Sequence, residues 1–176
     1  EKLGRIWFGE GFSVDNDQEF KFKFPNIVSS SSIEIKTHVA AITSTANLFK
    51  IEANTQLVGN ITLNPGSSSD AIVIEKNFSS TSSVSTEDVT IKVTFDNGGV
   101  PSSRGYLDYI NIKAKRNLQA FGKQFPFQFD QANTLLGIGE YQLSNASSIS
   151  QVWDVTDRFN VTKAENATQS ALSFKA

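Results

Sequence analysis

The segment from residue 89 to residue 95 alternates strictly between apolar and polar side chains. Its apolar members are Val89, Ile91, Val93 and Phe95. Successive side chains of a β-strand point to opposite faces, so this pattern predicts a strand with one buried face and one solvent-exposed face. The same period recurs in 20–24, where three phenylalanines alternate with two lysines, and in 33–40. The chain is therefore predicted to be mainly β.

Short apolar runs between polar turns account for much of the remaining chain. Further strands are expected near 49–51, 61–63, 71–74, 106–114, 125–129, 139–143, 150–155 and 171–174. The run Ala71–Ile74 is continuously apolar, which favours a central place in a sheet. Pro126 lacks a backbone donor, so the segment around it is predicted to be an edge or irregular strand.

Turn-forming residues separate these runs. Residues 64–70 and 96–99 are loops by composition, and 79–85 is a polar tract. No segment shows sustained helical spacing. Many short strands with frequent turns predict an antiparallel β-sandwich, jelly-roll-like, with little or no helix.

The length of 176 residues suits a single β-sandwich unit spanning 1–176. The tract 117–122 is a candidate boundary between two β modules, and both readings stay open. Because the sequence has no methionine and begins at Glu1, we expect it to be a processed or excised piece of a longer protein.

Composition excludes several classes of function. The formal net charge is −2, and the only basic cluster is Lys113–Arg116, so nucleic-acid binding is not expected. No apolar run reaches the roughly 20 residues that a transmembrane helix needs. Cysteine is absent, which excludes disulfides, thiolate catalysis and thiolate metal sites from this chain.

His38 is the only histidine. It falls on the polar side of an alternating strand, beside Glu34 and Lys36. A catalytic triad would need an acid to orient the ring and a serine nucleophile near it, and the sequence places neither. We therefore expect an exposed strand histidine.

Three aspartates are candidate calcium ligands: Asp15, Asp17 and Asp96. The run from Asp15 to Asp17 begins like a calcium-binding loop, but the EF-hand pattern fails where it needs glycine and glutamate, because Phe20 and Asn26 stand there. A polar turn explains the same residues. No cofactor is expected, with calcium kept as the alternative.

Four aromatic residues are candidates for a sugar-stacking platform: Trp7, Tyr106, Tyr109 and Trp153. Flat rings match the apolar face of a pyranose. Packing in the core or on a sheet is the competing interpretation, since such rings are usually mostly buried.

The run Val152–Asp157 contains two acids around a tryptophan. On a strand Val152 and Asp154 share one face, so Asp154 and Asp157 are not expected to converge on one substrate atom. A strand that ends in Asp-Val-Thr-Asp is typical of the start of a turn, where Asp and Thr side chains form hydrogen bonds with nearby backbone groups. We predict that Asp154 is a structural hydrogen-bond acceptor.

Three segments together resemble the gingipain-like cysteine peptidase family, and within it the sortases of the type IX secretion system, the PorU family. They are Ile6–Glu10, Ser103–Ile110 and Val152–Asp157. Their order and separation are similar to those in the region that precedes the peptidase domain. The structural-motif residues that the resemblance marks are Trp7, Glu10, Asp108, Tyr109, Trp153, Asp154 and Asp157.

The resemblance implies a context for the chain. In that family the catalytic Cys and His belong to a following α/β domain, so no catalytic residue is carried over to this chain, and whether it has any activity of its own stays open. The resemblance implies an exported protein at the outer membrane or cell surface of Bacteroidetes, whose whole form removes C-terminal sorting domains from secreted cargo. The implied partners are its own peptidase domain, outer-membrane components of the secretion system and cargo proteins.

Three functions compete. The first is a non-catalytic β domain that supports the sortase or contacts its protein partners. The second is a carbohydrate-binding jelly-roll module that recognises surface glycan. The third is an enzyme with a carboxylate pair, which no spacing favours. An apolar patch near the C-terminal strands favours the first, and exposed parallel aromatics in a groove favour the second.

Overall fold

The computed structural model describes residues 2–3, 6–13, 16–65, 72–134, 136–167 and 172–175. The chain forms two compact units, Glu1–Arg116 and Asn117–Ala176. The boundary falls at the start of the tract 117–122 that the sequence marked as a candidate. That the whole chain acts as one unit stays a prediction, and each unit is described by itself.

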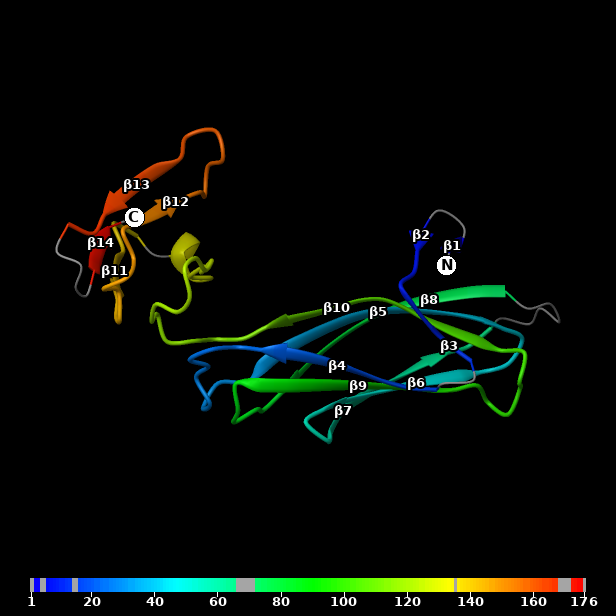
Figure 1. The fold of residues 1–176 in the computed structure, drawn as a ribbon. Coiled ribbons are helices and arrows are strands. Elements are labelled where there is room, and N and C mark those ends of the chain that lie inside the picture. The colour runs from blue at the N-terminus through cyan, green and yellow to red at the C-terminus, as the bar shows by residue number, and fades with distance from the viewer. Residues whose placement is uncertain are drawn as a thin grey trace. The chain divides into compact units, whose positions relative to one another are not determined.

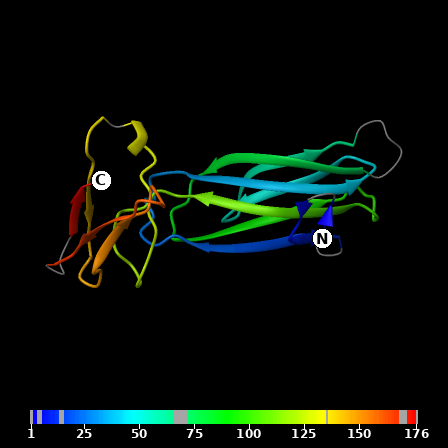
Figure 2. The same cartoon turned by 90° about the horizontal axis from the view of Figure 1, so that it is seen from above.

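The first unit contains two antiparallel sheets of four strands, with the orders β3-β10-β5-β8 and β4-β9-β6-β7 (Figures 1 and 2). A small pair, β1 with β2, precedes them. The strands are β1 (Lys2–Leu3), β2 (Ile6–Trp7), β3 (Glu10–Phe12), β4 (Asp17–Lys23), β5 (Ile33–Thr43), β6 (Asn47–Ala53), β7 (Gln56–Leu63), β8 (Ile72–Ser82), β9 (Asp88–Asp96) and β10 (Arg104–Lys113). The predicted antiparallel β-sandwich is confirmed.

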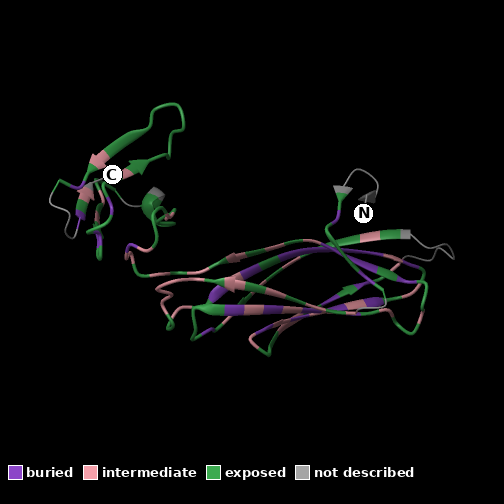
Figure 3. Ribbon diagram, in the orientation of Figure 1, coloured by how far each residue is buried: buried purple, intermediate pink, exposed green. Residues whose placement is uncertain are grey.

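The core of this unit lies between the two sheets, and both sheets contain buried residues, purple in Figure 3. Ile35 on β5 and Leu107 on β10 come from one sheet, and Phe49 on β6 and Val93 on β9 come from the other. The strict alternation of β9 gives this arrangement directly, because its four apolar side chains are all buried. The predicted register of β9 is confirmed.

Gly105 on β10 allows the two sheets to approach each other closely. A Cβ atom at this position would lie 2.6 Å from Cζ of Phe49 and 2.7 Å from Cδ2 of Phe95. Both rings are fully buried, and their centroids lie 4.8 Å apart. The glycine therefore leaves the space that this pair of rings fills.

Two predictions about β8 are wrong. Ala71 lies outside the described residues, and the rest of that apolar run begins β8, which is an edge strand with Val73 half-exposed rather than a central one. The polar tract is also partly strand, because β8 continues to Ser82. Ser80, paired with the buried Ile35, faces the other sheet, where its Oγ donates to the carbonyl of Val58, 3.3 Å away on β7.

The second unit is built from two antiparallel pairs, β11 with β14 and β12 with β13. Its elements are a 3₁₀ turn, η1 (Ala132–Thr134), and the strands β11 (Glu140–Leu143), β12 (Gln151–Asp154), β13 (Thr162–Glu165) and β14 (Leu172–Lys175). The small core contains Ala120, Leu143, Ala146, Ile149 and Leu172. Strand β13 has few apolar residues and was not predicted from the sequence.

The segment around Pro126 forms no regular strand. Its aromatic rings are held by other rings instead. The Phe125 ring stacks on Phe121 with centroids 4.9 Å apart, and Phe127 lies near both Tyr141 and Phe174. An edge or irregular strand was expected here. The segment is instead not part of any sheet, because packing between rings takes the place of backbone pairing.

Candidate functional site

A row of side chains crosses the face of the first sheet that points away from the core, which we call the outer face. His38 on β5 is paired with Tyr109 on β10 and with Asn77 on β8. Directly paired residues of an antiparallel sheet place their side chains on the same face. The three therefore stand side by side across the strands.

A β-bulge in β10 adds a fourth member to this row. Leu107 is paired with Val39 and Tyr109 with His38, so Asp108 is the extra residue between them. Regular alternation would turn Asp108 and Tyr109 to opposite faces, but at a bulge two residues oppose a single partner. Both side chains consequently contact His38.

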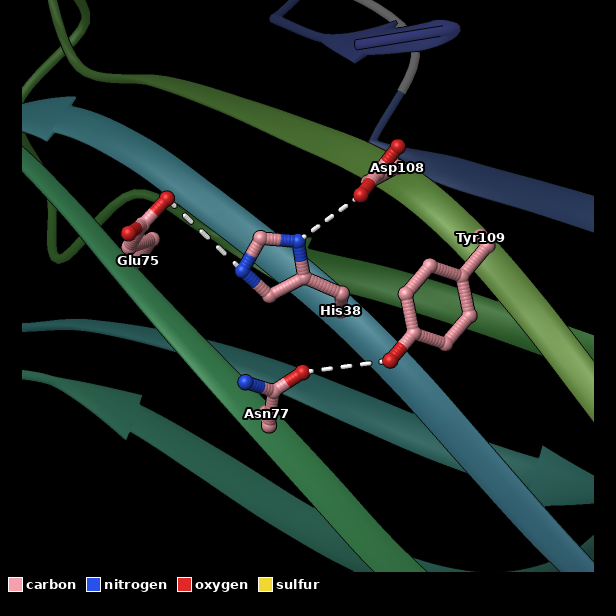
Figure 4. A network of polar contacts seen from close by, with 5 residues as sticks. All are labelled: His38, Glu75, Asn77, Asp108 and Tyr109. Carbon is pink, nitrogen blue, oxygen red and sulfur yellow. Dashed lines mark hydrogen bonds and ion pairs between the residues drawn. The ribbon is translucent and has the colours of Figure 1, made fainter. Parts of the chain in front are cut away.

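His38 lies between two acids, Asp108 and Glu75 (Figure 4), and is also in contact with two aromatic rings. Its Nδ1 lies 2.9 Å from Oδ2 of Asp108, and its Nε2 lies 3.7 Å from Oε2 of Glu75 on β8. The rings of Phe8 and Tyr109 both stack on the imidazole, with centroids 5.8 Å and 5.9 Å away. The imidazole is thus fixed in both position and orientation.

The expectation of an exposed strand histidine is wrong, because His38 is only 8% exposed. Alternation does place it opposite the core, as predicted. A second, smaller apolar cluster of Phe8, Ala40 and Tyr106 covers that face of the central strand. The outer face is therefore partly buried at β5 and open at β8, where Glu75 and Asn77 are exposed.

Tyr109 and Asn77 form the open part of the row. The Tyr109 hydroxyl donates to Oδ1 of Asn77 over 3.2 Å, as Figure 4 shows. Tyr109 is 44% exposed, so one side of its ring is in contact with His38 while the remainder meets solvent. This arrangement supplies an aromatic surface, an amide and a carboxylate within one sheet face, which is the chemistry of polar ligand binding.

The candidate calcium ligands have other roles where they are described. Asp15 lies outside the described residues. Asp17 pairs with Lys92, whose Nζ is 3.1 Å from Oδ2 of Asp17. Hydrogen bonds from Thr94 and Lys92 lower the pKa of Asp17. Asp96 Oδ1 accepts from the backbone amide of Gly98 at 2.9 Å, and no group of three or more His, Cys, Asp or Glu within the described ranges is placed to hold a metal ion.

The four aromatic candidates differ in burial and do not all belong to the same unit. Tyr106 is buried between Phe8 and the sheet, so the proposal that it stacks on a sugar is wrong. Trp7, at the end of β2, is 70% exposed, and Tyr109 lies on the outer face. Trp153 belongs to the second unit. Glu10, the remaining motif residue of the first unit, is exposed on β3 and paired with Leu107.

The run Val152–Asp157 forms the end of β12 and the start of its turn. Oδ1 of Asp154 accepts from the amide of Thr156, and Oδ1 of Asp157 accepts from the amide of Phe159, both at 2.9 Å. The bond from Thr156 lowers the pKa of Asp154. Asp154 is thus an acceptor in an exposed turn; that the run sets the register of the last strands stays a prediction.

Trp153 does not pack in a core, one of the interpretations that competed with sugar stacking, because 59% of it is exposed. Its strand partner is Lys163 on β13. The opposite face of β12 carries Val152, which packs on the small core of the second unit. Alternation therefore turns the valine inward and the tryptophan outward.

Exposed apolar side chains gather in the second unit. Of the eleven large hydrophobic residues that are exposed in the described part of the chain, seven lie beyond residue 117: Phe129, Leu136, Ile138, Trp153, Val155, Phe159 and Val161. Of the last four, Trp153 lies on β12 and the others lie in the turn that joins β12 to β13; we call the two strands and this turn the β12–β13 hairpin. Phe159 is 86% exposed at its tip.

Sequence reasoning missed Phe8, Glu75 and Asn77 as neighbours of His38. Their contacts depend on strand order and register, which only the fold gives. The one available signal was the adjacent pair Tyr109–Ile110, which interrupts the alternation of apolar and polar residues in a predicted strand. Such an interruption is compatible with a bulge but does not require one.

No protein-family model and no curated protein matches the sequence. Among solved structures, dimeric latent PorU from Porphyromonas gingivalis matches with a TM-score of 0.77 at 17% sequence identity. The match covers 98% of this chain and 17% of that chain, so this chain spans about a sixth of PorU. The resemblance predicted from the three sequence segments is thus confirmed at the level of the fold.

Two sugar-binding proteins match more distantly. A carbohydrate-binding module, CBM36 in complex with calcium and xylotriose, gives a TM-score of 0.44 at 15% identity over 64% of this chain and 87% of that chain. The C-terminal domain of EclA, a sugar-binding protein, gives 0.41 at 9% identity over 62% and 84% of the two chains. Neither likeness is strong enough to support an inference.

Within the described ranges, the structure contains no helix that is long and apolar enough to cross a membrane.

Proposed function

We propose that this chain is a non-catalytic β region of a longer, PorU-like sortase, in which it supports the peptidase domain or contacts protein partners. The observation that carries the proposal is the fold similarity, which extends over 98% of this chain yet covers only 17% of PorU. A region that matches a small part of a larger protein from end to end is best explained as one of its modules.

The sequence is consistent with a supporting role. It has no cysteine, so a cysteine peptidase cannot draw its nucleophile from these residues. His38 is enclosed by two rings, and both its nitrogens face carboxylates. Catalysis by the parent protein would then depend on residues of another domain.

The exposed apolar side chains of the second unit support protein contact as the role. Monomeric soluble proteins rarely expose contiguous apolar patches unless these bind something. The β12–β13 hairpin presents Trp153, Val155 and Phe159 to solvent. Tryptophan and other aromatic residues are enriched where protein interfaces gain most of their binding energy. We assign this hairpin as the contact with the peptidase domain or a secretion partner.

The same proposal gives the chain its setting. The parent is a cysteine endopeptidase at the cell surface of a Bacteroidetes species, which removes C-terminal sorting domains from exported cargo. Outer-membrane components of the type IX secretion system and cargo proteins are its partners. The activity, the location and the partners are all proposed for the whole protein on the basis of the PorU-like fold of this region.

Two observations test the proposal. The coding sequence downstream of residue 176 should encode an α/β segment with a Cys and a His; an unrelated downstream domain would contradict the proposal. The purified chain should also fail to cleave basic peptides and cargo-derived peptides. Cleavage that His38→Ala abolishes would show that the chain is itself an enzyme.

A further inference from the structure

We propose that the outer face of the first sheet, at Tyr109, Asn77 and Glu75, binds a neutral saccharide. This activity is separate from the supporting role proposed above, because it belongs to the first unit and needs no other domain.

The chemistry of the row matches a pyranose ring. A sugar presents an apolar face of C–H groups and a rim of hydroxyl groups. Tyr109 offers an aromatic ring that is 44% exposed, next to the exposed amide of Asn77 and the half-exposed carboxylate of Glu75. An aromatic surface beside a few fixed polar groups is the usual composition of a small-ligand site.

The donors and acceptors are already oriented. Oδ1 of Asn77 accepts from the Tyr109 hydroxyl at 3.2 Å, which turns the amide nitrogen of Asn77 to the other side, where it can donate to a sugar oxygen. The carboxylate of Glu75 can accept from sugar hydroxyls. A ligand that meets fixed partners loses less entropy on binding, so this order favours affinity.

His38 and Asp108 hold the exposed members of the row in place. The ring of Tyr109 rests on the imidazole of His38, and Asp108 fixes that imidazole through a bond of 2.9 Å. The bulge that brings Asp108 to His38 also turns Tyr109 to the outer face. Bulges are frequent beside functional sites, where they redirect a side chain. The buried His38 and the partly exposed Asp108 thus support the exposed tyrosine, as the second layer of a binding site does.

Charge selects the kind of sugar. Asp108 belongs to the row and Glu75 lies beside it, and Lys36, further along β5 on the same face, forms an ion pair with Glu34 at 3.1 Å. Acidic groups repel anionic ligands and accept hydrogen bonds from hydroxyl groups. A neutral oligosaccharide is therefore favoured over an acidic or phosphorylated one.

The test is a titration of the ¹⁵N-labelled chain with three neutral probes: cellotetraose, xylotetraose and mannotetraose. We expect at least one probe to shift the amide signals of β8 and β10 in a saturable way. Tyr109→Ala should weaken that binding about tenfold or more. Asn77→Ala should weaken it several-fold. The matched control is Asn60→Ala, an exposed strand asparagine on β7 of the other sheet, which should bind like the parent.

Three results would overturn the proposal: no saturable shift with any probe, equal binding by Tyr109→Ala and the parent, or shifts confined to the β12–β13 hairpin. Melting curves of each variant establish that lost binding is not lost folding. If Tyr109→Ala melts early, Tyr109→Leu keeps the apolar contact with His38 without the aromatic face, and unchanged binding by that folded variant would also contradict the proposal.

Discussion

The Nδ1 atom of His38 lies 2.9 Å from Oδ2 of Asp108, across a bulge that places Asp108 and Tyr109 on the same face of the sheet. The acid comes from β10 and the imidazole from the central strand β5. This pair gives a structural role to Asp108, the extra residue at the bulge of β10. It ties the bulge to the central strand, and it sets the position of the exposed tyrosine.

Replacing Asp108 with alanine should lower the free energy of unfolding by about 1–3 kcal/mol, because a buried ring nitrogen would lose its partner. Urea denaturation measures this change. The matched control is Asp154→Ala, which removes a turn bond in solvent and should stay within about 0.5 kcal/mol of the parent. Equal losses in the two variants would mean that the His38–Asp108 pair does not stabilise the sheet.

Gly105→Ala should lower the free energy of unfolding by about 1–3 kcal/mol or more, the usual cost of overpacking a core. The added Cβ would fall 2.6 Å from Phe49 and 2.7 Å from Phe95, which fill the core between the sheets. Gly9→Ala is the control, since its Cβ would meet only the Leu107 carbonyl at 3.8 Å. Thermal melts of both variants give the comparison, and a normal melting temperature for Gly105→Ala would contradict the described sheet spacing.

The strands of the first unit could be predicted where one face of the strand is buried and the other is exposed to solvent. Strand β9 shows this best, since its period-two pattern is uninterrupted and its burial follows it. Strand β8 shows the limit. Its apolar start resembles a central strand, but its continuation through serines reflects an edge position that depends on strand order. The local alternation of a sequence shows which face of a strand is buried, but it does not show which strands lie next to it.

The candidate site was less predictable for the same reason. Its members come from β5, β8 and β10, which are far apart in the sequence. Alternation placed His38 on the face away from the core, and that is correct. It could not show that Phe8 covers this face, because the covering residue lies in a short connection between β2 and β3. Burial of His38 depends on that long-range contact.

Val93→Ala should destabilise the chain by about 1–3 kcal/mol, through lost apolar contact and a small cavity. Val93 is fully buried on β9. Its neighbour Lys92 points to the wet face, where it pairs with Asp17. Lys92→Ala should therefore leave the urea midpoint close to that of the parent, and similar shifts for both changes would mean that the register of β9 is wrong.

Acid should destabilise the chain partly through Asp17. Hydrogen bonds from Thr94 and Lys92 hold the pKa of Asp17 below its ordinary value of 3.8 in the folded state. The folded state then binds fewer protons than the unfolded state, so this stabilisation is complete above about pH 4 and is lost as the pH falls through the lower, folded pKa. Urea unfolding between pH 6 and pH 2 should show a smaller decline for Asp17→Asn than for the parent. An identical decline would contradict this assignment.

If the β12–β13 hairpin is the contact between this chain and the peptidase domain of the longer sortase, calorimetric titration of the purified chain with that domain, produced separately, should show binding. The variant to compare carries Trp153→Ser and Phe159→Ser, two exposed changes that should leave the melting temperature near that of the parent. We expect the unmodified chain to bind the peptidase domain and the variant to bind it at least about tenfold more weakly. No binding by the unmodified chain, or equal binding by the chain and its variant, would contradict a contact between the hairpin and the peptidase domain.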